Sequence, residues 1–592
     1  MRWNLDALYK GFDDEFLNDL QAHIDEVSFR VKWANDNLIA CDDSGDDKIG
    51  KLEFYIKRQN EFMVFQKLGS YCSLVASVDD SNDEAKKYGD IIRKEAAPLS
   101  VPGTLFNQYV ANIGDEELDE LIGKSELLTE HAFLLKEIKQ KSKFLLSEKE
   151  EAILAHLKTT GSYAWLNMKN QALANMSIDV EVEGKTESLP LPAVRNLAYA
   201  AEPETRKAAY TAELESYKAV AKPVAAALNA IKGEVLTIAR LRGHSSPLHM
   251  TLINSRMEQQ TLEAMISAME SFMPSFRRYF IKKAQLLGHK EGKGLPFYDL
   301  FAPVGSASMR FSYDEAKAFI LEHFNSFSKK MGDFAAVVFD NEWIDYEVRK
   351  GKGGGAFCAN IHAIGQSRIM SNFDGSFSNV TTLAHELGHA YHGDCLKDLP
   401  YAKSHYTMPI AETASTFCET IITEAAMLKA DKAQALAILE EELSSAMQVI
   451  IDIYSRYVFE TRLFELRNNG PLSVDELNDE MLKAQKLAYG EGLNQELLHP
   501  YMWINKVHYY YAERNFYNFP YAYGQLFAMG LYARYKQEGA AFVPVYDAIL
   551  AKTGAATLEQ VGDLAGIDVR NRAFWESSLQ VFEKKVDEYC KF

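Results

Sequence analysis

The sequence predicts a mainly α protein of two lobes that contains one small β element. At 592 residues the chain is longer than a single hydrophobic core usually supports, which favours two or more lobes. Apolar residues recur at three- and four-residue steps through most of the chain, and this is the spacing of amphipathic helices. Between Trp343 and Phe377 the pattern breaks into glycines and short apolar pieces. That stretch predicts a small sheet or hairpin within a helical protein.

The helical patterns can be placed in order along the chain. The first runs from Glu15 to Asn35. Further helices are expected at residues 52–78, 130–143, 148–174, 202–241 and 260–287, and almost throughout from Ser378 onward. The first strand signal is Ile178–Val182, where apolar and acidic residues alternate before a glycine and two prolines. We therefore place a candidate domain boundary near Ala193.

The composition excludes several classes of partner. The chain has 64 Lys and Arg against 83 Asp and Glu, a formal charge of −19, and such a surface repels phosphate backbones. The six cysteines include no C-x-x-C pair and do not indicate a disulfide framework. No apolar run resembles a signal peptide or a membrane span. We expect a cytoplasmic protein that binds neither nucleic acid nor membrane.

Residues 380–392 carry the most specific motif and read V-T-T-L-A-H-E-L-G-H-A-Y-H. His385 and His389 are one helical turn apart, so their imidazoles share a face, and zinc accepts such a pair of ligands. Glu386 lies beside them and could act on a water molecule without binding the metal. A random chain of this composition would contain H-E-x-x-H roughly 0.03 times. We predict a zinc-binding helix with Ser378 or Asn379 as its N-cap and Gly393 near its end.

A catalytic zinc ion needs a third protein ligand and an open position. The extended motif H-E-x-x-H-x-x-G-x-x-H would require glycine and histidine where His392 and Cys395 stand. Met408 and Pro409 occupy the positions at which another class of zinc peptidases carries its glutamate. Both of these ligand patterns are therefore excluded.

The next credible carboxylate is Glu412, in a segment that Pro409 can begin as a helix. Glu419 lies seven residues further on the same helical face, and it could orient a ligand histidine through a hydrogen bond. We predict one Zn²⁺ ion per chain, held by His385, His389 and Glu412. Cobalt and manganese accept similar nitrogen and oxygen ligands, so the native metal stays open.

The H-E-L-G-H motif followed by Glu412-x-x-Ser415 resembles the thimet oligopeptidase/oligoendopeptidase F family of zinc peptidases. The resemblance extends to K-G-G-G-A-F-C at residues 352–358, and the opening W-N-L-D-A-L-Y is similar to the oligoendopeptidase F branch. It implies a two-lobed helical enzyme of the zincin type, with the small β element beside the zinc helix and a deep channel that admits oligopeptides. It also implies a helical N-terminal lobe over residues 1–192 and a catalytic domain over residues 193–592.

A tyrosine-rich segment covers residues 503–535. In the family a histidine and tyrosines of the matching segment bind substrate and stabilise the transition state, and the closest matches here are His508, Tyr510, Tyr517 and Tyr521. The thimet branch is glycine-rich between these residues, whereas this chain has A-E-R-N at 512–515, so the register of the tyrosines stays open. Each tyrosine could instead be a core residue with its hydroxyl at the surface.

The glycine-rich residues 351–355 lack the Gly-Lys-Ser/Thr sequence of a phosphate loop. They could form a plain hairpin turn or a strand edge that pairs with the backbone of an extended peptide. In the second case Gly353, Gly354, Gly355 and Ala356 would contact the substrate. We interpret three further histidines as structural, because they lack the spacing of a ligand set: His362, His392 and His405.

These observations favour a zinc metalloendopeptidase that hydrolyses internal bonds of short peptides by a zinc-activated water, with Glu386 as general base. Two alternatives stay open. One is a metal-dependent exopeptidase or a hydrolase of another bond. The other is a non-catalytic helical protein that binds peptides and only keeps the motif.

Overall fold

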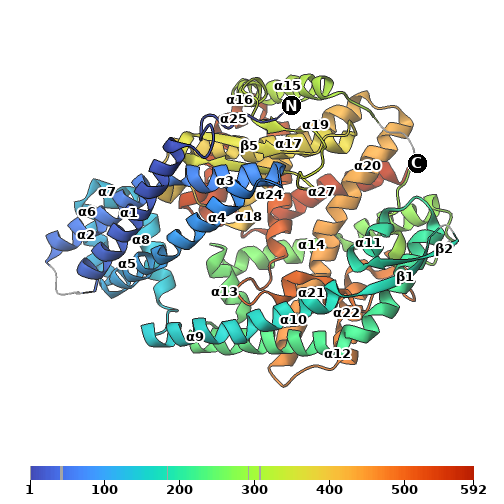
Figure 1. Ribbon diagram of the computed structural model, residues 1–592. Helices are drawn as coiled ribbons and strands as arrows, with labels where there is room; N and C mark the ends of the chain where they lie inside the picture. The colour runs from blue at the N-terminus through green and yellow to red at the C-terminus, as the bar shows by residue number, and fades with distance from the viewer. Residues whose placement is uncertain (1, 40–43, 183, 291, 306–308) are drawn as a thin grey trace. The chain divides into compact units, whose positions relative to one another are not determined.

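The computed structural model describes residues 2–39, 44–182, 184–290, 292–305 and 309–592. The described part is mainly helical and contains two small sheets, so the predicted fold class is confirmed (Figure 1). Cys41 lies outside the described residues, and the other five cysteines are free thiols. Within the described stretches, no helix combines the length and the apolar composition needed to cross a membrane.

The chain folds into two compact units, and each unit is assembled from three stretches. The first unit comprises Met1–Lys143, Met309–Ala426 and Arg534–Ile567, and the second comprises Phe144–Ser308, Met427–Ala533 and Asp568–Phe592. The boundary expected near Ala193 lies inside the second unit, where a helix follows a hairpin, and the division at this point remains a prediction.

The first unit packs helices around a three-stranded sheet. Its main elements are α1 (Asp14–Asn37), α2 (Gly45–Phe62), α3 (Gln66–Val78), α4 (Asp83–Ala96), α5 (Ser100–Asn112), α6 (Asp115–Lys124), α7 (Glu126–Glu130), α8 (Ala132–Ser142), α15 (Tyr313–Phe327), α16 (Lys329–Asp340), β3 (Ile344–Asp345), β4 (Phe357–Ile361), β5 (Gln366–Met370), α17 (Phe377–Leu396), α18 (Met408–Ala411), most of α19 (Thr413–Lys429), α25 (Val543–Lys552) and α26 (Leu558–Leu564). The strand order is β3-β5-β4, so β4 is an edge strand. Helix α17 packs against both β4 and β5.

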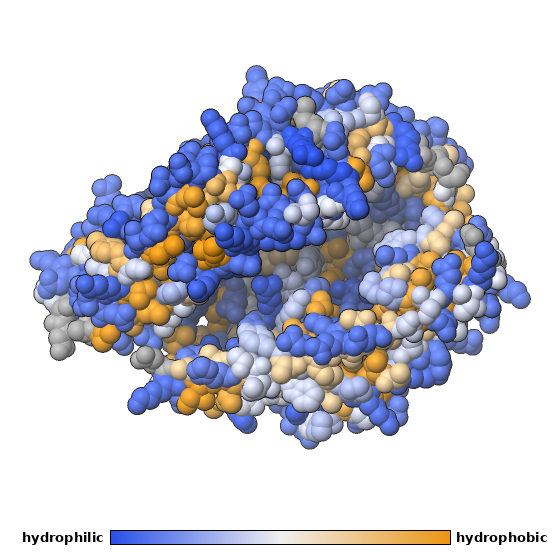
Figure 2. All heavy atoms as spheres, viewed as in Figure 1, coloured by the Kyte–Doolittle hydropathy of each residue, from blue (hydrophilic) through white to orange (hydrophobic). Residues whose placement is uncertain are grey.

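The second unit is built around the long helix α12. Its main elements are α9 (Glu148–Thr160), α10 (Ser162–Ala174), β1 (Ser177–Val182), β2 (Lys185–Pro190), α11 (Leu191–Asn196), α12 (Pro203–Leu241), α13 (Pro247–Asn254), α14 (Gln259–Leu286), α20 (Lys432–Met447), the π-helix η7 (Gln448–Asp452), α21 (Ile453–Arg467), α22 (Val474–Tyr489), α23 (Met502–Asn505), most of α24 (Phe519–Glu538) and α27 (Arg572–Tyr589). Its core includes Tyr217, Leu228, Phe459 and Trp503. Hydrophilic residues cover much of the visible face of the molecule (Figure 2).

Three expectations about helices were wrong. The helix expected over residues 52–78 is two helices, α2 and α3, separated by the 3-10 turn Met63–Phe65. The other two have a physical reason in the contacts of a glycine or a cap. The helix expected over residues 148–174 is two helices that break at Gly161. A Cβ atom at Gly161 would lie 2.5 Å from the carboxylate of Glu234, which accepts hydrogen bonds from the backbone N–H and the hydroxyl of Ser162. The carboxylate of Glu234 therefore caps the start of α10 and fixes the break.

The third correction concerns the helix that was predicted to bind zinc. Helix α17 begins after Ser376, whose side chain accepts from the N–H of Asn379, so neither Ser378 nor Asn379 is the N-cap. The helix also continues past Gly393 to Leu396. A Cβ atom at Gly393 would lie 2.5 Å from the side-chain amide of Asn360 on β4. Gly393 therefore makes room for the sheet and does not end the helix.

Candidate metal centre

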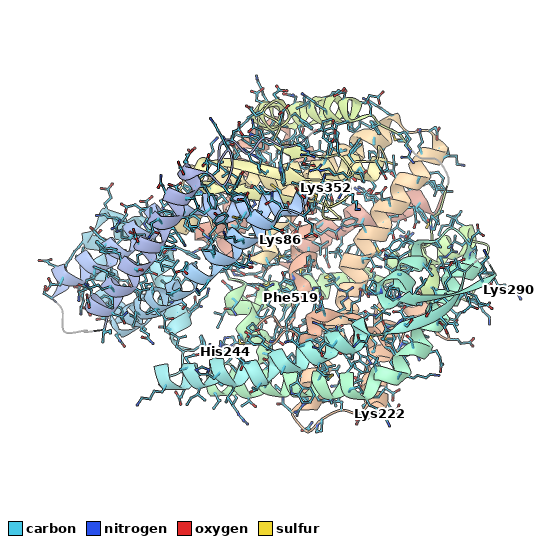
Figure 3. All side chains as sticks on the ribbon, viewed as in Figure 1. Lys86, Lys222, His244, Lys290, Lys352 and Phe519 are labelled. Carbon is cyan, nitrogen blue, oxygen red and sulfur yellow. The ribbon has the colours of Figure 1, made fainter. Side chains whose placement is uncertain are left out.

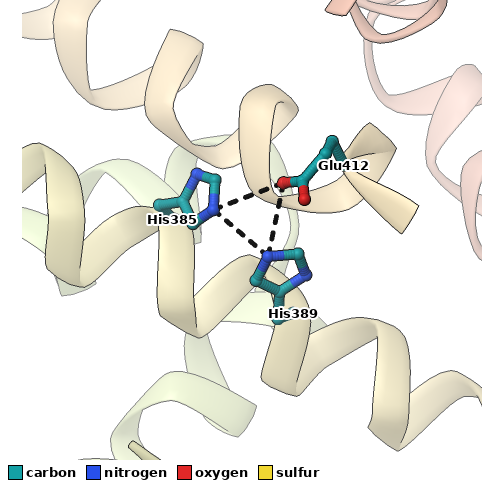
Figure 4. Close-up of side chains that lie close together, drawn as sticks. All are labelled: His385, His389 and Glu412. Carbon is teal, nitrogen blue, oxygen red and sulfur yellow. Dashed lines mark hydrogen bonds and ion pairs between the residues drawn. The ribbon is translucent and has the colours of Figure 1, made fainter. Parts of the chain in front are cut away.

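Three predicted ligand atoms meet in the first unit (Figure 4). Nε2 of His385 and Nε2 of His389 are 3.1 Å apart, and each lies 3.4 Å from Oε2 of Glu412. Three ligands of one tetrahedral zinc ion at about 2.0–2.1 Å would be about 3.3 Å apart. The spacing and the chemistry of these two imidazoles and one carboxylate therefore fit a zinc ion.

Two neighbouring helices supply the cluster. His385 and His389 lie on α17, and Glu412 lies at the junction between α18 and α19, where Pro409 occupies the first turn of α18 as expected. The hydroxyl of Ser415 donates to Oε2 of Glu412 at 3.0 Å. This bond fixes the orientation of the carboxylate toward the two imidazoles.

Glu419 stands where the sequence places it, beside the ligand pair. Its Oε1 lies 2.9 Å from Nδ1 of His385. A proton on Nδ1 leaves the lone pair of Nε2 directed at the cluster, which is the tautomer that a metal requires. Burial opposes protonation of His385, but the hydrogen bond and the charge of Glu419 outweigh it and raise the pKa of His385 to about 9.

The electrostatics of the cluster keep its carboxylate ionised. Burial alone would favour the neutral form of Glu412, yet the hydrogen bond and charge of His389 outweigh burial and lower the pKa of Glu412 to about 2. An ionised carboxylate is the form that binds a divalent cation.

Glu386 differs from Glu412 in its surroundings. The residue is only 6% exposed, and among the described residues none forms a hydrogen bond to its carboxylate. Burial raises the pKa of Glu386 above its usual value, while the charges of His385 and His389 oppose the shift. A buried carboxylate with a raised pKa and no fixed partner can exchange a proton with a nearby molecule.

Comparison with models of protein families shows which family the chain belongs to. A model described as Peptidase family M3 matches residues 196–581, which is more than half of the chain. The chain belongs to peptidase family M3. A second model, described as Oligopeptidase F, matches residues 110–177, and together they confirm the resemblance to the oligoendopeptidase F branch.

Curated relatives agree with this assignment, and solved structures share the fold. The peptidase is 25% identical over 486 residues to Oligopeptidase PepF of Bacillus subtilis, a match that covers 81% of this chain and 71% of the relative. It is 23% identical over 614 residues to an oligoendopeptidase F homolog of Lactococcus lactis, with coverage of 100% and 97%. The structure of oligoendopeptidase-F from Enterococcus faecium superposes with a TM-score of 0.71 at 19% identity, covering 97% and 98% of the two chains. A structure from Chlamydophila abortus gives a TM-score of 0.86 at 20% identity, with coverage of 100% and 98%.

The glycine-rich segment of the peptidase lies directly before the edge strand β4. The N–H of Gly353 donates to the carbonyl of Ser77 at 2.8 Å, and Asn372 donates to the carbonyls of Gly353 and Gly355, both at 3.0 Å. Gly355 has a φ of 78°, and Gly354 has open space around its α carbon. Gly353, Gly354 and Gly355 are exposed and Ala356 is half-buried, so this edge is held in place while its outer side faces solvent.

Lys352 anchors the same segment (Figure 3). Its ammonium group donates to Oδ1 of Asp345 at 2.7 Å and to the carbonyl of Ser371 at 2.5 Å. The lysine side chain and the Asp345 carboxylate are both fully buried, and Arg349 forms a second ion pair with the carboxylate. A buried ion pair that is saturated with hydrogen bonds holds its segment rigidly.

The predicted aromatic residues lie in the second unit, and three of them form one group. The rings of His508 and Tyr517 are 5.3 Å apart, and the rings of Tyr517 and Tyr521 are 5.9 Å apart. All three residues are half-buried. Tyr510 is different, because it is 1% exposed in the core of this unit and its hydroxyl donates to the carbonyl of Trp503. Its burial does not support a role as an oxyanion donor.

Sequence reasoning missed two residues that shape the metal centre. Gly388 allows close contact between α17 and α19, because a Cβ atom there would lie 2.6 Å from the carbonyl oxygen of Ala414. Asn360 on β4 donates to the carbonyl of His389 at 3.0 Å and accepts from the hydroxyl of Ser367 at 2.7 Å. The available signals were the glycine within H-E-L-G-H and a lone asparagine in an otherwise strand-like segment.

Proposed function

We propose that this peptidase is a zinc-dependent endopeptidase that hydrolyses internal bonds of short oligopeptides. The single observation that carries the proposal is the convergence of His385, His389 and Glu412 at zinc-ligand spacing, beside the buried carboxylate of Glu386. The names of the relatives, Oligopeptidase PepF and oligoendopeptidase F, support short peptides as substrates and internal bonds as targets.

In the proposed mechanism the two histidines and Glu412 hold the metal, and Glu419 fixes the tautomer of His385. When bound there, zinc would polarise the scissile carbonyl and acidify water. The carboxylate of Glu386 accepts a proton from the attacking water and passes it to the leaving nitrogen. Its raised pKa suits both steps, because the group must take up a proton and release it again.

Substrate binding is assigned to two places. The backbone of residues 353–356 and the edge strand β4 pair with an extended peptide, which selects peptides over folded proteins. His508, Tyr517 and Tyr521 donate hydrogen bonds to the oxyanion of the transition state. The contacts between these rings, from His508 to Tyr517 and from Tyr517 to Tyr521, support a shared role for the three side chains.

Metal analysis and product analysis test the proposal together. Elemental analysis of the purified protein should find one zinc ion per chain, and a peptide blocked at both ends should be cut at an internal bond. Cleavage only of unblocked peptides, one terminal residue at a time, would indicate the exopeptidase alternative. A zinc-loaded protein that binds but does not cut the blocked peptide would indicate the non-catalytic alternative.

A further inference from the structure

A polar cavity lies wholly within the second unit, and none of the residues assigned to catalysis above lines it. It has a volume of about 330 Å³. Helix α11, the first half of α12 and the turn Phe297–Asp299 form its walls. The polar side chains that line it include Arg195, Tyr210, Glu213, Asp452, His499 and Lys506.

Most charged groups of this cavity form ion pairs, and one does not. Nε of Arg195 lies 3.4 Å from Oε1 of Glu213. Asp452 pairs with the guanidinium of Arg456, which is on the next turn. Arg206, which also lines the cavity, pairs with Asp299 at 2.6 Å.

Lys506 is the remaining charged group. Among the described residues none forms a hydrogen bond or an ion pair with its ammonium group. Lys506 is therefore the one charged group of the cavity that no described residue pairs with. Burial, with a contribution from the charge of Arg456, lowers the pKa of Lys506 to about 7, and an anion placed beside it would relieve that cost.

His499 is a second group in the cavity, and one of its ring nitrogens has no partner. The residue is 1% exposed, its Nε2 lies 3.5 Å from Oε1 of Glu213, and its Nδ1 forms no hydrogen bond among the described residues. Its backbone is fixed on both sides, because Gln485 accepts from its N–H at 3.0 Å and donates to its carbonyl at 2.8 Å. Buried polar atoms are almost always paired, so the unpaired Nδ1 of a firmly positioned imidazole indicates a missing ligand group.

Aromatic rings form the other side of the cavity. The ring of Tyr210 lies 5.7 Å from that of Tyr298 and 6.3 Å from that of Phe297, and Phe297 lies 5.2 Å from the ring of His499. Rings at these distances present faces and edges on which a further ring can pack. The cavity thus combines an apolar wall with one unpaired cation, and its size is at the lower limit for a small-molecule site.

We propose that this cavity binds a small aromatic monocarboxylate, with the carboxylate on Lys506 and His499 and the ring against Tyr210, Phe297 and Tyr298. The single negative charge matches the single unpaired ammonium group, which excludes a dianion and a neutral ligand as the preferred occupant. This site is separate in its residues from the proposed peptide site, so it does not depend on the peptidase reaction.

Calorimetry on the zinc-loaded enzyme tests the charge requirement. The probes are 3-phenylpropionate and its neutral analogue 3-phenylpropionamide, compared at about pH 6, where Lys506 is protonated. The carboxylate should bind at least about tenfold more tightly than the amide. Equal affinities, or no measurable binding of the carboxylate, would overturn the proposal.

Two further measurements locate the binding. Lys506→Met should lose at least about tenfold in affinity for 3-phenylpropionate, whereas Lys222→Met, at an exposed position on α12 (Figure 3), should bind as the wild type does. If Lys506→Met binds 3-phenylpropionate as tightly as the wild type, the probe binds elsewhere, for example at the metal centre, and the assignment is contradicted. The second measurement uses the wild type and so does not depend on the folding of a variant. There, 3-phenylpropionate should protect Lys506 but not Lys222 from reductive methylation, as measured by mass spectrometry. Equal labelling of Lys506 with and without the probe would also overturn it.

Discussion

Gly388 and Ser415 bring two helices into backbone contact at the metal centre. A Cβ atom at Gly388 would lie 2.6 Å from the Cα atom of Ser415, closer than real Cβ contacts allow. Ser415 also orients Glu412 through its hydroxyl. The missing side chain at Gly388 therefore sets how closely the helix of the third ligand approaches the helix of the two histidines.

The first prediction concerns this contact. Gly388→Ala should push α19 away from α17 and weaken zinc binding by at least about tenfold, as misplaced supporting groups do at other metal sites. Gly69→Ala is the matched control, because Gly69 also lies in a helix but has open space around it, and alanine there should stabilise α3 by up to about 1 kcal/mol. Zinc affinity is measured by competition with a chelator. Unchanged affinity in Gly388→Ala would show that the helices adjust without cost to the ligands.

The second prediction separates metal binding from proton transfer. Glu386→Gln keeps the size of the side chain but removes the group that accepts the proton, so activity on a quenched peptide should fall by about a thousandfold or more. The zinc content should stay at the wild-type level, because Glu386 is not among the three clustered ligand atoms. Glu84→Gln, at an exposed position on α4, is the control for the same change. Activity within a few-fold of the wild type would remove Glu386 from this role.

The third prediction concerns the hydrogen bond between Glu419 and His385. Glu419→Gln leaves an oxygen that can accept from Nδ1 but removes the negative charge, and Glu419→Ala removes both. Zinc affinity should fall in both variants, by about 10–100-fold in the alanine variant. The glutamine variant should lie between alanine and the wild type. If the two variants bind zinc as tightly as the wild type, the contact with His385 has no part in holding the metal.

The fourth prediction tests the edge of the sheet. Gly355 has a φ of 78°, so Gly355→Ala strains the backbone by about 1–2 kcal/mol and should displace the carbonyl that Asn372 holds. Gly354→Ala is the neighbouring control, because its backbone lies outside the left-handed region and its surroundings are open. In steady-state kinetics we expect KM for an oligopeptide to rise several-fold in Gly355→Ala with little change in kcat. A change confined to kcat would indicate that the segment acts in the chemical step.

The sequence was sufficient to predict the cluster of His385, His389 and Glu412, because these residues lie close together in the chain. His385 and His389 share a helix face by spacing alone, and Glu412 was found by excluding other positions. The contact of Glu419 with His385 also follows from the seven-residue spacing to Glu412. These inferences need only the geometry of one helix at a time.

The features that could not be predicted arise from contacts between distant segments. Gly161 ends a helix because Glu234, far along the chain, caps the next one. Gly393 was expected to end its helix, but its missing side chain instead makes room for Asn360 of the sheet. Tyr510 and Tyr517 belong to the same tyrosine-rich segment, yet one is a core residue and the other is half-buried. Periodicity predicts which face of a helix or strand a residue lies on. It does not predict which distant segment packs against that face.

The last prediction concerns pH and His392, which is a fully buried residue of helix α17. Its Nε2 lies 2.8 Å from the hydroxyl of Thr553, and its ring stacks on Tyr406 at 4.1 Å. Burial, together with the charge of His389, lowers the pKa of His392 to about 3. In the unfolded chain the pKa is about 6.5, so between about pH 6.5 and pH 3 the unfolded state binds more protons. Stability must therefore fall as the pH falls through this window.

His392→Gln removes this titration and should flatten the pH dependence. The wild type should lose about 2 kcal/mol of stability from this one group between about pH 7 and pH 5, in addition to losses from other groups. Thermal unfolding of chelator-treated protein at the two pH values measures the difference, and His156→Gln, at an exposed position on α9, is the matched control. Removal of metal matters because a bound ion would add its own proton linkage through His385 and His389. The prediction is contradicted if the wild type, His392→Gln and His156→Gln all lose the same stability on acidification. In that case the imidazole of His392 is protonated without unfolding, and its burial does not contribute to acid denaturation.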